Sequence, residues 1–220
     1  MLESNFPLQY FSRVDESDDG FFYGEPRKVV HIDDNAIDTV SAVFRDFIPA
    51  DSVVLDFMSS WRSHWPQDHL KRRLVGLGLN AEEMIDNPDL DEHIVQNVNQ
   101  NPCLPFRDNL FDAVVITVSV QYLTKPIEIF RELNRVMKEN GVLIVSFSNR
   151  MFPTKAVNIW RNTDDKGHLD LVSSYMQYAE GFEDIKGGLA NAQSSPPNNP
   201  LFVVMGTKNT NSYDSESSIV

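Results

Sequence analysis

The fold is decided by residues 52–66, SVVLDFMSSWRSHWP, in which a run of apolar β-formers ends on Asp56 and gives way at once to small polar residues. A continuous apolar run of this kind is typical of a strand buried on both faces of a parallel sheet. In open α/β sheets, ligands bind outside the carboxyl ends of the strands. The stretch therefore predicts a strand that leads into a ligand-binding loop.

Strands and helices are expected to alternate on both sides of this stretch. A helix with apolar residues at helical spacing precedes it over about 34–47, with Asp33 or Asp34 at its start. Asn80 and Glu83 have the spacing of a capping box for a short helix. Further strands are expected at 73–77, 93–97, 112–118, 142–147, 182–185 and 201–207, and further helices from Thr124 to about 140 and, with a polar break, over 154–178. This order predicts a parallel, doubly wound α/β sheet with an antiparallel edge.

Composition limits the class of protein and its partners. The chain has 220 residues and a formal net charge of −13, which would repel the phosphate backbone of nucleic acids. No window approaches the roughly 18 apolar residues of a membrane span, so we expect no membrane partner. The only cysteine, Cys103, shows neither disulfide nor metal-ligand spacing, and no metal is expected. The first residues lack the pattern of a secretory signal, which favours a cytoplasmic location.

One domain is expected over residues 21–208. Residues 1–20 end in an acidic run and contain few apolar groups, so we expect a flexible arm that does not pack. Residues 209–220 have the composition of a disordered tail. The sequence leaves the oligomeric state open.

Two segments carry a resemblance to a known family. They are LPFRDNLFDAVV at 104–115 and FRELNRVMKENGVLIVSFSN at 130–149. In these segments, and in motif order over about 29–208, the chain resembles class I S-adenosylmethionine (SAM)-dependent methyltransferases, in particular the small type 11 proteins. The resemblance implies a Rossmann-like fold, a seven-stranded and mostly parallel sheet with helices on both faces. It also implies SAM as cofactor and a small molecule as methyl acceptor.

The cofactor motifs depart from that family. Its first strand ends on an acid followed by G-x-G-x-G; here Asp56 is kept, but residues 57–62 read FMSSWR. The acid that ends its second strand is matched by Gly78, and its adenine-binding Asp by Asn97, whose amide can still accept a hydrogen bond. The positions that the resemblance assigns to the cofactor are Asp56, Met58, Ser59, Ser60, Leu79, Asn80, Asn97, Val98, Asn99 and Ser119.

Two interpretations of these departures stay open. Ser59, Ser60, Asn80 and Asn97 have hydroxyl and amide groups that can form a variant polar cradle for SAM. Alternatively, the protein is a catalytically silent methyltransferase-like scaffold that has lost SAM binding, because a fold does not determine a function.

Three residues are candidates for the catalytic step, and each has a purely structural alternative. His31 precedes two acids that would raise its pKa, or it lies near a helix cap. His64 either faces the acceptor or packs around a tryptophan, and Tyr122 either faces the acceptor or fills the core. Asn149 and Arg150 are substrate contacts or the start of a solvated loop. Aromatic residues that suggest a pocket wall, or core, are Phe21, Phe22, Tyr23, Trp61, Trp65 and Tyr122.

Overall fold

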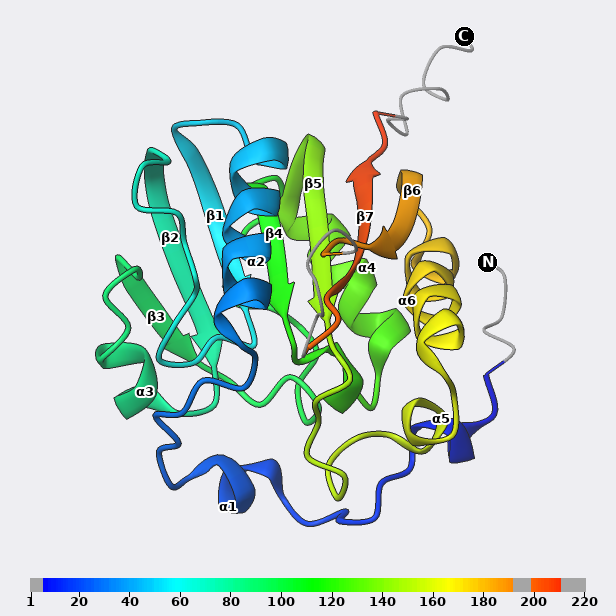
Figure 1. The fold of residues 1–220 in the computed structure, drawn as a ribbon. Coiled ribbons are helices and arrows are strands. Elements are labelled where there is room, and N and C mark those ends of the chain that lie inside the picture. Colours follow the sequence, from blue (N-terminus) through cyan, green and yellow to red (C-terminus); the bar gives the residue numbers. More distant parts are fainter. Residues whose placement is uncertain (1–5, 192–198, 211–220) are drawn as a thin grey trace, which may run out of the picture.

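The strand that carries Asp56 lies in the interior of a seven-stranded sheet (Figure 1). The computed structural model describes residues 6–191 and 199–210, and the sheet order is β3-β2-β1-β4-β5-β7-β6. The strands are β1 (Ser52–Phe57), β2 (Lys71–Gly78), β3 (Glu92–Val95), β4 (Phe111–Thr117), β5 (Met137–Phe147), β6 (Phe182–Leu189) and β7 (Phe202–Lys208). The first five pair in parallel, and β7 pairs antiparallel with both β5 and β6. The predicted fold class is confirmed.

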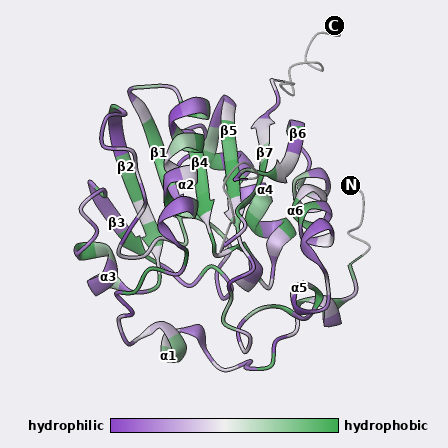
Figure 2. Cartoon of the chain, in the orientation of Figure 1, coloured by the Kyte–Doolittle hydropathy of each residue, from purple (hydrophilic) through white to green (hydrophobic). Residues whose placement is uncertain are grey.

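Helices cover both faces of the sheet. The buried side of α2 (Asp34–Phe47), with Val40 and Phe44, packs on one face. On the other face α4 (Pro126–Val136) packs beside α6 (Asp165–Ala179). The described residues also contain three short α-helices, α1 (Asp19–Tyr23), α3 (Ala81–Ile85) and α5 (Asn158–Arg161), and two short 3₁₀ helices, Leu8–Phe11 and Val120–Tyr122. Figure 2 shows hydrophobic residues concentrated on the central strands and hydrophilic ones on the outer helix surfaces. Among the helices of the described ranges, none has the length and apolar character needed to span a membrane.

Element boundaries follow the sequence pattern except where tertiary pairing intervenes. Asp33 caps α2 and Asn80 caps α3, as the capping patterns predict. The helix expected from Thr124 instead begins at Pro126, with Lys125 at its N-cap. It ends at Val136 rather than near residue 140, because Met137 already pairs with Phe111 across the sheet.

The N-terminal segment differs from its expected form. Residues 6–20 lie against the body of the protein, so the expectation of an unpacked arm is corrected for them. The rings of Phe6 and Phe11 lie 6.0 and 6.2 Å from that of Tyr175. Lys155 is fully buried, with its Nζ 3.1 Å from Asp15 and 3.2 Å from Asp19. The acidic run has a buried cationic partner far away in the sequence, which local composition does not reveal. Residues 1–5 of the arm and 211–220 of the tail lie outside the described residues.

Candidate functional site

A cavity of about 490 Å³ lies beyond the carboxyl ends of β1, β2 and β4. The N-terminal segment around α1 runs past these strand ends (Figure 1) and lines part of the cavity. The volume is within the range of about 300 to 1,000 Å³ usual for small-molecule sites. Every candidate catalytic and cofactor-binding residue lines it: His31, Asp56, Met58, Ser59, Ser60, His64, Leu79, Asn80, Asn97, Val98, Asn99, Ser119 and Tyr122. The structure brings them together in one site, and their roles stay predictions.

The loop after β1 folds back on the sheet. Asp56 Oδ2 accepts hydrogen bonds from the hydroxyls of Ser59 and Ser63, each at 2.6 Å. The backbone N–H of Ser59 donates to the carbonyl of Leu77 in β2 at 2.8 Å. Met58, with φ of 61°, makes the turn. Burial raises the pKa of Asp56 to about 6 despite the two hydroxyl donors, which lower it.

Two members of the expected polar cradle bind other parts of the protein. The Ser60 hydroxyl donates to Glu83 Oε2 at 2.6 Å. Asn80 accepts from the Glu83 backbone N–H at 3.0 Å and donates to the carbonyls of Tyr23 and Gly24 at 2.9 and 3.1 Å. Their polar groups therefore hold α3, the β1 loop and α1 together, and a ligand would have to share or replace those bonds.

Gly78 and Asn97 also differ from what the resemblance implies. A Cβ at Gly78 would lie 2.2 Å from the carbonyl oxygen of Ser59, so the β1 loop fills the space that an acidic side chain would need. The Asn97 Oδ1 accepts from the backbone N–H groups of Asn99 and Gln100 at 3.1 and 3.3 Å. This leaves its amide nitrogen, rather than its oxygen, for a ligand, so Asn97 would donate where an acceptor is expected.

Three buried hydroxyls of the cavity wall have no hydrogen-bond partner among the described residues: those of Tyr23, Thr117 and Ser119. Ser119 is only 8% exposed. Buried polar groups are nearly always paired, so such groups indicate a missing ligand or water. Between the last two lies Val118 with φ of 46°, which is strained for a β-branched residue. Backbone strain of this kind clusters at functional sites.

The candidate catalytic residues have shifted pKa values. The pKa of His31 is lowered, chiefly by partial burial, which corrects the expectation that acids raise it; Asp33 instead caps α2. Burial also lowers the pKa of His64. Both rings are thus neutral at pH 7 and able to accept a proton. Burial raises the pKa of Tyr122, whose hydroxyl accepts from the backbone N–H of Phe152 at 2.8 Å.

Known proteins are similar to this chain in sequence or in fold. The family model "Methyltransferase domain" matches residues 65–145. An S-adenosylmethionine-dependent methyltransferase from Mesorhizobium loti is similar in structure, with a TM-score of 0.54 and 11% identity over 78% of this chain and 100% of that one. The chain therefore has the fold of class I SAM-dependent methyltransferases, and its residues 65–145 are similar to the methyltransferase domain family.

Two other similar proteins differ in the activity that their names state. The [4+2]-cyclase SpnF has a TM-score of 0.59 and 14% identity over 84% of this chain and 90% of that one. A malonyl-[acyl-carrier protein] O-methyltransferase from Marinomonas sp. is 28% identical over 44% of this chain. The matched region spans only 34% of that relative.

The region matched by the family model begins just after the β1 loop. It starts at residue 65, so neither Asp56 nor residues 57–64 fall within it. The segment that departs in sequence is the same one that folds back on β2.

Sequence reasoning missed several residues of the cavity. Arg27, Glu83 and Phe152 line it, although no motif singles out Arg27 or Phe152 and Glu83 was noted only as part of a capping box. They lie in a loop, at a helix start and in a second loop, and only the tertiary fold brings them together. Conversely, Trp65 packs in the core against Phe44, and Phe21 is 84% exposed; neither lines the cavity.

Proposed function

We propose that the cavity binds SAM and that the protein transfers its methyl group to a small-molecule acceptor. The observation that carries this proposal is the set of unpartnered hydroxyls, above all Ser119, in a cavity at the strand ends. In open α/β sheets this edge is the ligand-binding one. When bound, SAM supplies a methyl group on a sulfonium centre that is ready for transfer.

The residues that would hold SAM are those with free groups. Thr117 and Ser119 have unpartnered hydroxyls, and Asn97 has an amide nitrogen. Leu79 and Val98 add apolar surface suited to an adenine ring. Methyl transfer needs mainly alignment and the exclusion of water, which a cavity favours more than an open surface does.

A base is needed only where the acceptor carries a proton. His31 and His64 line the cavity, and their lowered pKa values keep them neutral at pH 7. Either can then accept the proton as methyl transfer proceeds.

The names of relatives support methyl transfer in part. The Marinomonas relative is named as an O-methyltransferase, whereas SpnF is named as a cyclase. The superfamily fold therefore permits more than one chemistry.

A catalytically silent scaffold is the second candidate. It is favoured by the internal hydrogen bonds of Ser59, Ser60 and Asn80, which occupy groups expected to bind the cofactor. A protein of this kind would keep the β1 loop folded back on the sheet and would not bind SAM.

Calorimetric titration with SAM and with its demethylated product separates the two candidates. Saturable binding of both by the wild type supports the methyltransferase, and no heat at millimolar SAM supports the scaffold. Ser119→Ala and Asn97→Ala each remove a neutral hydrogen bond and should weaken binding roughly 2- to 12-fold. Ser146→Ala is the matched control, because Ser146 is a buried serine like Ser119 but lies within β5, outside the cavity. Equal affinity in all three variants would contradict the assigned contacts.

A further inference from the structure

The acidic side chains that line the cavity all have partners within the protein. Asp19 pairs with Arg13 at 2.6 Å and with Lys155. Asp56 accepts from two serine hydroxyls. Glu83 accepts from Ser60 and from a backbone N–H. Of the three, only Asp19 is ion-paired, whereas Asp56 and Glu83 are held by neutral donors.

Two arginines of the cavity wall, Arg27 and Arg150, are in the opposite situation. Among the described residues, neither guanidinium has a carboxylate within ion-pair distance or a hydrogen-bond acceptor. The third arginine of the wall, Arg62, donates to the carbonyls of Trp61 and Asp86 at 2.8 and 3.3 Å. In a chain of net charge −13, two unpaired guanidinium groups at one cavity are a local exception.

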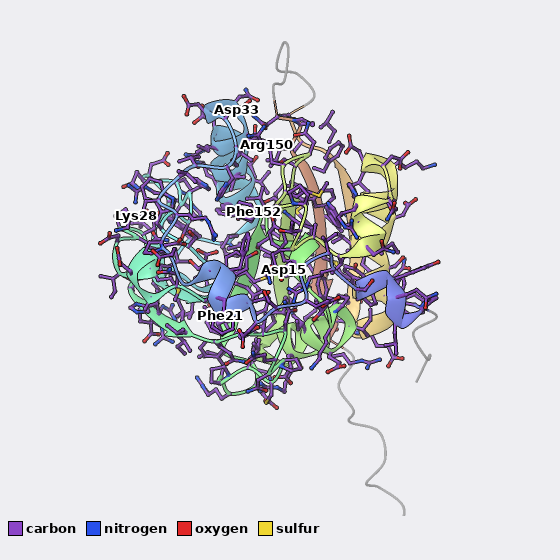
Figure 3. All side chains as sticks on the ribbon, turned by 90° about the horizontal axis from the view of Figure 1, so that it is seen from below. Asp15, Phe21, Lys28, Asp33, Arg150 and Phe152 are labelled. Carbon is purple, nitrogen blue, oxygen red and sulfur yellow. The ribbon has the colours of Figure 1, made fainter. Side chains whose placement is uncertain are left out.

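These two arginines converge on one part of the cavity. The guanidinium carbon of Arg27 lies 5.5 Å from the ring centre of Phe152, and Arg150 lies two residues before that ring. The ring of His31 lies 5.2 Å from that of the same phenylalanine. Burial is the main cause of its lowered pKa, Glu83 opposes that shift, and the charges of Arg27 and Arg150 add to it. Figure 3 views the molecule from below, the side of α1 in Figure 1, and shows Arg150 and Phe152 near each other.

An apolar wall adjoins the two arginines. The rings of Tyr122 and Phe152 stack with their centres 6.0 Å apart, and Tyr23 lies edge-on to Tyr122 at 6.4 Å. Stacked rings of this kind favour a flat, apolar ligand. The unpartnered Tyr23 hydroxyl adds one polar group at this wall.

We propose that the methyl acceptor carries a carboxylate or phosphate group held by Arg27 and Arg150, with an apolar ring lying against Tyr122 and Phe152. The guanidinium fork matches both anions in geometry and forms short, charge-assisted hydrogen bonds with them. The inference rests on the proposed function only in naming this ligand as the acceptor, because the anion site itself needs no SAM.

Binding of probe anions tests the site without any assay of activity. Benzoate and phenyl phosphate represent the two anion classes, and benzyl alcohol is the neutral match. We expect at least one anion to bind the wild type saturably by calorimetry, at least about tenfold more tightly than benzyl alcohol, and to bind less well as salt is added. The preferred anion identifies the class of acceptor.

Single variants then locate the site. Arg150→Gln and Arg27→Gln should each weaken anion binding about tenfold or more, because each removes a charged donor. Arg62→Gln, the matched control, should leave it unchanged. Arg27 also stacks on Phe22, so Arg27→Lys, which retains the charge, should recover part of the affinity if folding is intact.

Failure of this inference is distinguishable from failure of the proposed function. Equal binding of benzyl alcohol and the anions, no anion binding at 10 mM, or anion binding unaffected in both Gln variants would overturn the anion site. SAM titration of the same samples reports on the methyltransferase separately.

Discussion

Burial and hydrogen bonding shift the pKa of the Asp56 carboxyl group in opposite directions. Burial raises its pKa from 3.8 to about 6, and the hydroxyls of Ser59 and Ser63 only partly offset this. A carboxyl whose pKa is raised on folding binds its proton more tightly in the native state. Its contribution to stability is therefore full below about pH 4 and is lost as the pH rises through about 6.

Asp56→Asn should remove this pH dependence, because the amide does not titrate. The free energy of unfolding of the variant relative to wild type should increase from pH 4 to pH 7 by up to about 3 kcal/mol, from the shift of roughly two pKa units. Urea unfolding at both pH values measures the difference. A constant difference would show that the carboxyl titrates normally in the folded protein.

Gly78 gives a second residue-scale prediction. A Cβ there would lie 2.2 Å from the Ser59 carbonyl, so Gly78→Ala must displace the β1 loop and should cost about 1–3 kcal/mol. Gly188→Ala is the control, since a Cβ at Gly188 meets nothing within 4 Å. Equal stability of the two variants in urea unfolding would mean that the loop moves freely.

Residue positions at the site were predictable, but their bonding was not. The end of β1 and the polar residues after it marked Asp56 and Ser59, and the resemblance to methyltransferases marked Asn97 after β3. That the serine hydroxyl points to Asp56 and that Asn97 turns its oxygen to the backbone depend on loop conformation. Such conformations are set by tertiary packing, which the sequence pattern does not encode locally.

At the scale of elements, one buried cationic side chain, that of Lys155, adds to the contacts that hold the N-terminal segment. Lys155 has no exposed surface and contacts Asp15, Ser17 and Asp19. Lys155→Met retains most of the volume but leaves Asp19, which is 3% exposed, with one cation fewer. Breaking a buried pair costs about 3–5 kcal/mol.

We therefore expect Lys155→Met to lower the unfolding midpoint and to speed amide exchange over residues 8–23. Lys28→Met is the control, because Lys28 pairs with Glu82 and Asp86 at the surface and should matter little. Unchanged exchange in the Lys155 variant would show that the aromatic contacts of Phe6 and Phe11 suffice to hold the segment.

Most elements could be predicted, since apolar periodicity and capping residues are local signals. The exceptions arose from long-range contacts. α4 ends early because Met137 pairs with Phe111. The N-terminal segment packs because it binds Lys155, which lies more than a hundred residues away in the sequence.

For the whole molecule, the order of strands and helices was sufficient to predict the sheet and the edge at which ligands bind. It did not predict the segments that form the outer wall of the cavity at that edge, residues 19–32 and 149–153, because they have no periodic pattern. The cavity is a property of the complete fold.

Deletion of residues 1–20 should accordingly destabilise the whole protein. It removes Phe6 and Phe11 from Tyr175 and leaves Lys155 buried without its acids. We expect the melting temperature to fall by at least several degrees, at about 2–4 °C per kcal/mol for a domain of this size. Deletion of residues 211–220, predicted from composition to be disordered, should not change it. Equal melting temperatures for both deletions would contradict the packing of the N-terminal segment.

The position of β7 has a consequence for protein synthesis. Among the strands of the described residues it comes last in the sequence, yet it lies between β5 and β6. As the nascent chain leaves the ribosome, β6 emerges before it has a partner, and β5 keeps an open edge until residue 208 is free. An unpaired edge is a template for pairing with other chains. The nascent chain therefore remains prone to aggregation until β7 has been synthesised and has paired with β5 and β6. Chains on ribosomes stalled before residue 202 should accordingly bind chaperones.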